Sequence, residues 1–252
     1  MTAMDAAKKV LRDVFGYDAF RPGQESAVAA ILEGRDVLAV MPTGAGKSLC
    51  YQIPALVLPG ITLVVSPLIS LMRDQVFALL QNGVHAAYLN STLTSRQYVR
   101  ALDNARHGLY KIIYVAPERL MTDAFLRFAQ GANIAQVVVD EAHCVSQWGQ
   151  DFRPGYLQIE PFIASLAVRP RVSAFTATAT QAVRQDIVRL LRLREPYPVL
   201  TGFDRPNLYF EVRKTADRDA ELLRFLGEHR GQKRHRLLRH AQDGGRGGRH
   251  AL

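Results

Sequence analysis

The chain has 252 residues, of which 48% are hydrophobic and 22% are charged. This length and balance are typical of a soluble globular protein with one large domain or one and a half domains, and they exclude a chain without a core. The formal net charge is +9, but residues 233–252 hold six Lys or Arg against one Asp and so carry +5 of it. The rest of the chain is only mildly basic, so charge alone hints at nucleic acid without establishing it.

The cysteine count and the hydropathy pattern indicate the cellular environment and whether the chain crosses a membrane. Cys50 and Cys144 are too few and too far apart for a disulfide framework or a zinc finger, so we expect no zinc and a reducing, cytoplasmic environment. The first 16 residues lack the apolar core of a signal peptide. No charge occurs between Lys47 and Arg73, but three prolines and a glycine interrupt this stretch. A buried helix followed by a buried strand is therefore favoured over a membrane span.

Short β-rich apolar runs recur along the first four fifths of the chain. They lie at residues 36–40 (DVLAV), 61–65 (ITLVV), 111–115 (KIIYV), 136–140 (QVVVD) and 171–175 (RVSAF). Runs this apolar indicate strands buried on both faces, which is typical of a parallel sheet. Segments between them, such as 68–81 and 180–193, have apolar residues at helical spacing. The pattern predicts an α/β fold with helices on both sides of a parallel sheet.

The first of these runs is followed by MPTGAGKS, residues 41–48, and then by an apolar helical segment. Glycines allow a tight loop whose N–H groups wrap phosphates at a helix N-terminus, where Lys47 would reach the β and γ phosphates and Ser48 would bind magnesium. Met41 stands where the strict phosphate-loop pattern has its first glycine. The alternative is a glycine-rich turn with a surface lysine, which the strand–loop–helix context disfavours. The loop residues expected to hold nucleotide are Thr43, Gly44, Ala45, Gly46, Lys47 and Ser48.

A second candidate lies at the end of the run VVVD, where Asp140 and Glu141 follow one another. An acid at the carboxyl end of a strand beside a phosphate loop is placed to hold the magnesium of a nucleotide, and a neighbouring glutamate can orient or deprotonate the attacking water. Two acids at a strand end can also be merely solvated. Together with the phosphate loop, however, the pair predicts nucleotide hydrolysis.

Three of these segments carry a resemblance to a known family. MPTGAGKS, DEAH (140–143) and TATAT (176–180) resemble motifs I, II and III of a superfamily 2 helicase, and the similarity runs from about residue 10 to residue 230. Further stretches resemble the RecQ family of ATP-dependent DNA helicases: FGYDAFRPGQ (15–24), SPLISLMRDQV (66–76), YVAPERL (114–120), DEAHCVSQWGQDFRPGY (140–156) and FDRPN (203–207). The resemblance implies a RecA-like fold, ATP and Mg²⁺ as cofactors, DNA as partner, and 3'-to-5' unwinding in recombination and repair.

The resemblance also assigns residues to the nucleotide. It implies that Gln24 reads the adenine edge, a task that suits an amide able both to donate and to accept, and that Tyr17 and Arg21 stack on the base. The catalytic set carried over is Lys47, Asp140, Glu141 and His143, with Ser48 and Asp140 as magnesium ligands. The alternative for residues 15–24 is a loop packed on the core, and Phe15 and Phe20 are expected to do that.

The DNA contacts implied by the resemblance lie in the loop after DEAH and at two strand ends. The segment after DEAH resembles the aromatic-rich loop that senses single-stranded DNA, in which Trp148 and Phe152 offer flat surfaces to bases and Arg153 offers charge. A lone tryptophan is more often a core residue, but its polar and glycine-containing surroundings argue for a loop. SPLISLMRDQV, which opens with Ser66 and Pro67, and YVAPERL both begin at strand ends, where N–H groups could meet the phosphodiester backbone. The alternative for each segment is a simple strand-to-helix turn.

Two further features of the RecQ pattern bear on these loops. Thr176 and Thr178 resemble the segment that couples ATP state to DNA grip. The commoner family form has histidine where Gln150 stands and glutamate where Gly155 stands, so the connections within the aromatic-rich loop differ from that form.

The resemblance divides the chain into a first RecA-like domain at 1–205, the start of an incomplete second lobe at 206–230, and a basic, disordered tail at 231–252. Codons can be chosen for residues 233–250 such that reading from one nucleotide later gives SGIVYCATRKTVEEVAA, which resembles the next family strand, turn and helix. A frameshift is favoured over an Arg/Gly-rich tail that binds nucleic acid, because the segment is short and irregular for such a tail. Because the family uses two lobes for unwinding, a weak ATP- and DNA-binding module without catalytic activity stands as the alternative to a helicase, with a cytoplasmic, nucleoid-associated location if the source is bacterial.

Overall fold

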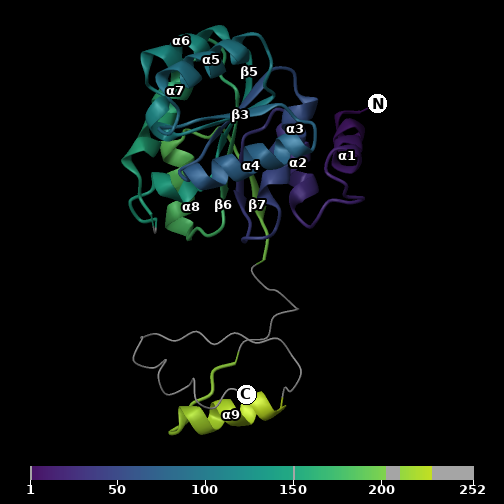
Figure 1. Cartoon of the computed structure of the whole chain (residues 1–252), viewed down its shortest axis with the longest axis vertical. Coiled ribbons are helices and arrows are strands. Elements are labelled where there is room, and N and C mark those ends of the chain that lie inside the picture. The colour runs from purple at the N-terminus through teal and green to yellow at the C-terminus, as the bar shows by residue number, and fades with distance from the viewer. Residues whose placement is uncertain (1, 150, 203–210, 229–252) are drawn as a thin grey trace. The chain divides into compact units, whose positions relative to one another are not determined.

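The computed structural model describes residues 2–149, 151–202 and 211–228 (Figure 1). The chain divides into two compact units, Met1–Phe203 and Asp204–Leu252. Because residues 203–210 and 229–252 lie outside the described part, the FDRPN segment, the domain boundary at 205 and the reading of the tail stay predictions. In the second unit the described residues form one helix, α9 (Arg218–Glu228), and Asp217 Oδ1 accepts hydrogen bonds from the N–H groups of its first turn.

The first unit consists of a sheet and its flanking helices. The strands are β1 (Val37–Val40), β2 (Ile61–Val65), β3 (Ala86–Leu89), β4 (Ile112–Val115), β5 (Ile134–Val139), β6 (Arg171–Thr176) and β7 (Tyr197–Leu200). The helices are α1 (Ala3–Asp13), α2 (Gln24–Leu32), α3 (Lys47–Val57), α4 (Ile69–Gln81), α5 (Ser95–Arg106), α6 (Asp123–Gly131), α7 (Ile159–Ala164) and α8 (Gln181–Leu190). Three short 3₁₀ turns are η1 (Pro117–Arg119), η2 (Ala142–Val145) and η3 (Pro154–Gln158).

The sheet has seven strands in the order β3-β4-β2-β5-β6-β1-β7, and every pair is parallel. The predicted α/β fold with a parallel sheet is therefore confirmed, and the five predicted runs form β1, β2, β4, β5 and β6. The sequence did not indicate β3 and β7, which are the two edge strands. Both give a weak strand signal, because AAYL of β3 has no β-branched residue and YPVL of β7 contains a proline.

Helices cover both faces of the sheet (Figure 1). One core cluster joins one set of strand side chains to α5, α6, α7 and α8, and the other joins the opposite set to α2, α3 and α4. The helix α1 packs on α2 and α3 as an outer layer. Phe15 and Phe20 pack partly against these clusters, as expected.

The uncharged stretch after Lys47 forms α3 and β2, whose residues are largely buried, so the prediction of a buried helix and strand is confirmed. Within the described residues, no helix is long and apolar enough to cross a membrane.

The parallel arrangement places every strand's carboxyl end at one edge of the sheet. In the strand register Val40 is level with Thr176, and Val65 is level with Val139. The loops that follow β1, β2, β5 and β6 therefore begin side by side. Along the sheet the chain runs from β1 through β2 to β3 and then back through β4 to β7, and α/β sheets bind ligands at the carboxyl edge where the strand order reverses in this way.

The opposite edge is held together by a buried carboxylate. Asp36, only 3% exposed, accepts two hydrogen bonds from Arg169, at 3.1 and 2.6 Å. It also accepts from the N–H groups of Val172, at 2.9 Å, and Arg194, at 2.7 Å. One side chain thus ties together the amino ends of β1, β6 and β7.

We expect Asp36→Ala to lower the free energy of unfolding by about 3–5 kcal/mol, because it takes the carboxylate from the partly buried Arg169 guanidinium and leaves two N–H groups without their acceptor. Urea unfolding followed by circular dichroism measures the loss. Asp18→Ala removes an exposed carboxylate and serves as the control. A loss no larger than that of the control would contradict the role assigned to Asp36.

Candidate functional site

The loop between β1 and α3 is shaped by two glycines and one buried methionine. Gly44 and Gly46 have φ of 85° and 77°, in the left-handed region that favours glycine. Met41 is fully buried in the core, and its N–H donates to Thr176 O at 3.0 Å. The methionine that departs from the usual phosphate-loop pattern is therefore an anchor in the core. Lys47 Nζ donates to Met41 O at 3.2 Å, so its ammonium lies across the loop.

Gln24 and Arg21 both hold this loop. The Gln24 side chain is 1% exposed, and its Nε2 donates to Ala45 O at 2.9 Å and Gly46 O at 3.2 Å. Its Oε1 accepts from the Arg21 N–H at 2.9 Å, and Arg21 Nη1 donates to Gly44 O at 2.9 Å. Both ends of the Gln24 amide are thus engaged. The predicted reading of adenine by Gln24 stays a prediction, and it requires Gln24 to exchange one of these bonds.

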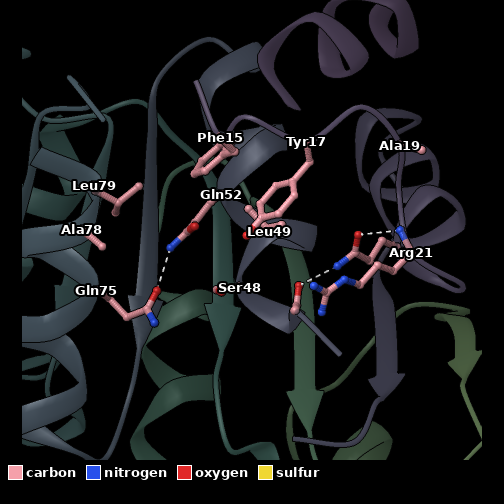
Figure 2. Close-up of a pocket in the computed structure, with 12 residues that line it drawn as sticks. Phe15, Tyr17, Ala19, Arg21, Ser48, Leu49, Gln52, Gln75, Ala78 and Leu79 are labelled. Carbon is pink, nitrogen blue, oxygen red and sulfur yellow. Dashed lines mark hydrogen bonds between the residues drawn. The ribbon is translucent and has the colours of Figure 1, made fainter. Parts of the chain in front are cut away.

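A cavity of about 240 Å³ opens beside the loop, between residues 15–24, α3 and α4 (Figure 2). Tyr17, Arg21 and Ser48, all predicted from the sequence, line it. Tyr17 is 46% exposed, which leaves its ring accessible for stacking.

The sequence did not single out two glutamines of this cavity. Gln52 of α3 donates to Gln75 Oε1 of α4 at 2.8 Å and to Tyr114 OH at 3.0 Å. Figure 2 shows Gln52 and Gln75 facing each other across the cavity. The helix that begins at the phosphate loop is thereby hydrogen-bonded to the helix that follows Ser66 and Pro67. The signal that could have revealed them is a glutamine on each otherwise apolar helix face.

At the end of β5 the two predicted acids differ in their surroundings. Asp140 is 7% exposed, and burial, together with the nearby Glu141 charge, raises its pKa to about 6. The Glu141 N–H bond to Asp140 Oδ1 and the Lys47 ammonium act in the opposite direction. The strand order and register place the phosphate loop after β1 and the acids after β5 at the same edge of the sheet. Glu141 has φ 48°, a conformation costly for a residue with a Cβ and common at functional sites.

His143 joins the acidic segment to the segment after β6. Its Nδ1 lies 2.9 Å from Thr176 Oγ1 and 3.4 Å from Glu141 Oε2. Because the Thr176 hydroxyl donates to Thr178 O at 3.0 Å, Thr176 Oγ1 is the acceptor toward His143, so Nδ1 carries the proton. The structure therefore brings the predicted catalytic residue His143 and the predicted coupling residues into one hydrogen-bonded set.

The loop after η2 presents the one tryptophan of the chain to solvent. Trp148 is 79% exposed, which confirms the expected loop position. The backbone N–H of Trp148 donates to Ser146 Oγ at 3.2 Å, and the Ser146 hydroxyl donates to Asp186 Oδ2 of α8 at 2.8 Å. A Cβ at Gly149 would lie 2.3 Å from His143 O, so the turn is tight enough to require glycine. The exposed ring thus stands on a tightly held loop.

Arg153 connects this loop to the turn after β2. Its Nη1 donates to Pro67 O at 3.0 Å, and its Nε and Nη2 donate to Asp151 Oδ2 at 3.0 and 2.7 Å. Phe152 is half-buried. Ser66 is 1% exposed and its N–H donates to Val115 O, so the geometry offers no exposed Ser66 group to DNA. Arg153 and Pro67 are in contact, which the sequence did not indicate.

The described residues contain no group of three or more metal-ligating side chains. The donor set nevertheless fits magnesium, because Mg²⁺ is commonly bound by one or two protein oxygens together with nucleotide phosphates. The Ser48 hydroxyl and the Asp140 carboxylate would supply these oxygens, and the ion would neutralise phosphate charge there.

Comparison with known proteins agrees with this geometry. The parallel sheet and the loop after β1 define a RecA-like helicase domain. Residues 21–187 match the DEAD/DEAH box helicase family, and the chain belongs to that family. Within it, the chain matches the N-terminal part of RecQ proteins.

Two sequence relatives illustrate the match. The ATP-dependent DNA helicase RecQ of Bacillus subtilis is 46% identical over 230 residues, which cover 91% of this chain and 38% of the relative. The Pasteurella multocida protein of the same name is 47% identical over 225 residues, covering 89% and 35%. The chain thus spans little more than a third of the length of these relatives.

Solved structures show the same fold at lower identity. A hypothetical ATP-dependent RNA helicase from Sulfolobus tokodaii has a TM-score of 0.60 at 21% identity, over 78% of this chain and 57% of that one. The DUF1998 helicase MrfA bound to DNA has a TM-score of 0.63 at 17% identity, over 80% and 30%.

We expect Asp140→Asn to raise the free energy of unfolding at pH 8 in magnesium-free buffer, on the order of 1–3 kcal/mol. The folded state raises the Asp140 pKa, so the ionised carboxylate costs stability as the pH rises through about 6. The advantage of the variant should therefore grow between pH 5 and pH 8.

Urea unfolding of wild type and variant at both pH values measures this difference. Glu33→Gln removes an exposed acid and should show no such growth. Equal stability of wild type and Asp140→Asn at both pH values would contradict the expected cost of the buried charge.

Proposed function

We propose that this chain binds ATP with Mg²⁺ and, beside it, single-stranded DNA, as the first motor lobe of a RecQ-type 3'-to-5' DNA helicase. The observation that carries the proposal is a continuous set of contacts between the two sites. Met41 of the phosphate loop bonds to Thr176, Thr176 bonds to His143, and the loop carrying Trp148 starts directly after His143. A change at the phosphates can therefore reach the exposed tryptophan through hydrogen bonds and one short turn.

On the ATP side, the N–H groups of Thr43–Ser48 and the Lys47 ammonium would bind the phosphates. Asp140 and Ser48 would hold Mg²⁺, and Glu141 would orient the attacking water. His143 would report phosphate loss to Thr176. Tyr17, Arg21 and Gln24 would bind the base in the cavity that Figure 2 shows.

On the DNA side, the exposed Trp148 ring would stack on a base, with Phe152 behind it. The Arg153–Pro67 contact joins this loop to the turn after β2, so stacking at Trp148 and backbone contact at Pro67 would move together. The proposed helicase would act in the cytoplasm on single-stranded or forked DNA, in recombination and repair.

A second function applies to the 252-residue polypeptide by itself. The described residues contain one RecA-like unit, and in the RecQ family a second lobe supplies an arginine finger, whose loss costs on the order of 10³-fold or more in rate. We propose that this polypeptide binds ATP and single-stranded DNA without separating strands. Purified polypeptide that unwinds a forked duplex would overturn this second proposal and leave the first intact.

Lys47→Ala should weaken ATP–Mg²⁺ binding by roughly 10–150-fold, because a charge-assisted hydrogen bond to phosphate contributes about 1.5–3 kcal/mol. Titration with a fluorescent ATP analogue measures the loss. Lys9→Ala removes an exposed lysine of α1 and is the matched control. In a protein that carries both lobes, Lys47→Ala should abolish ATP turnover, and undiminished binding and turnover would refute the assignment.

Gly149→Ala should weaken single-stranded DNA binding while leaving ATP binding within about twofold. The added Cβ meets the His143 and Ser146 carbonyl oxygens at 2.3 and 3.1 Å, so the Trp148 loop must shift. Quenching of Trp148 fluorescence by oligothymidine measures DNA binding. Gly131→Ala is the matched control because its Cβ meets nothing within 4 Å, and equal quenching curves for both variants would count against DNA contact at this loop.

A further inference from the structure

The edge of the sheet opposite the phosphate loop carries a second cavity, of about 600 Å³. It lies at the amino ends of β1, β5 and β6 and beside the start of β7. Four arginines line it, and they come from three different loops: Arg35, Arg169, Arg171 and Arg194. Strands of four to six residues separate this edge from the phosphate loop, which is about 13–20 Å.

Asp36 fixes the geometry of this cavity. It accepts both the Arg169 guanidinium and the Arg194 N–H, and its other backbone partner, Val172, directly follows Arg171. The loops that carry the arginines are therefore held in place before any ligand binds. Asp36 also neutralises Arg169, so the remaining charge of the cavity comes from the other three arginines.

These three arginines have no carboxylate partner within 4.0 Å in the described part of the chain. Arg171 Nε is buried and has no hydrogen-bond acceptor there. Arg35 stacks its guanidinium 4.8 Å above the Tyr197 ring, which leaves its N–H edges available. The exposed Glu195 also lines the cavity, so three positive charges face one negative charge and the excess is +2.

We propose that this cavity binds phosphate groups. A guanidinium presents paired N–H donors that match phosphate oxygens, and a buried donor without an acceptor is costly unless a ligand supplies one. Pro59, Val168 and Pro170 also line the cavity beside the arginines. The phosphates come either from a nucleic-acid backbone or from a free phosphate compound, and the inference does not rest on the proposed function.

The test uses the full chain with two probes, a fluorescein-labelled oligothymidine and inorganic pyrophosphate. Modification of individual arginines by phenylglyoxal, located by mass spectrometry, reports on each site separately. We expect a probe that binds here to protect Arg171 and Arg194 at least threefold more than it protects Arg96 and Arg100, which are exposed on α5.

Charge variants provide the second measurement. In R171Q/R194Q, the slope of log affinity for oligothymidine against log salt should fall by about 1.4, because each lost contact with a single strand contributes about 0.7. R96Q/R100Q removes the same charge from α5 and should leave the slope unchanged. R171K/R194K keeps the charge and should retain most of the slope, and equal urea unfolding curves for wild type and the variants show that the fold is intact.

Protection and a changed slope with oligothymidine assign the cavity to nucleic acid. Protection by pyrophosphate alone assigns it to a small phosphate compound. The proposal is overturned if neither probe protects Arg171 and Arg194 more than Arg96 and Arg100. It is also overturned if protection by oligothymidine is accompanied by equal slopes in the two glutamine variants.

Discussion

Parallel pairing of the strands is the constraint on which the candidate site depends. Parallel neighbours point their carboxyl ends the same way, so four loops that are far apart in sequence begin at one edge of the sheet, after Val40, Val65, Val139 and Thr176. The phosphate loop, the turn after β2, the acidic pair and the threonine segment meet for this reason. The strands that carry these loops, β1, β2, β5 and β6, are almost entirely buried, which makes the edge rigid enough to hold polar groups in fixed positions.

Within that edge, groups that would be costly alone are held by one another. The phosphate loop is tied to Gln24, Arg21 and Thr176, and the strained Glu141 lies beside His143. The hydroxyl proton of Thr176 is used at Thr178, so His143 must donate to Thr176. These contacts give the proposed ATP and DNA sites a physical connection, because displacement of one partner leaves the others without their hydrogen bonds.

The two edges of the sheet use buried carboxylates in opposite ways. The Asp36 carboxylate accepts four hydrogen bonds, two from Arg169 and two from backbone N–H groups, so it holds the amino ends of three strands together. Asp140 accepts one backbone N–H and lies beside a second acid, so burial raises its pKa. A carboxylate with few protein partners retains capacity for a cation, whereas one with four hydrogen bonds does not.

The sequence by itself determined the fold class and most of the candidate site, because apolar strands and the spacing of MPTGAGKS and DEAH are local signals. The exposure of Trp148 was likewise readable from its polar and glycine-containing surroundings. The sequence did not indicate the edge strands β3 and β7, because the first has no β-branched residue and the second contains a proline. Tertiary structure alone decided the burial of Ser66, the engagement of the Gln24 amide with the phosphate loop, and the Gln52–Gln75 contact. The arrangement of the arginines around Asp36 was also decided by tertiary structure alone. All of these features depend on contacts between segments that are far apart in the chain, and no local sequence pattern encodes such contacts.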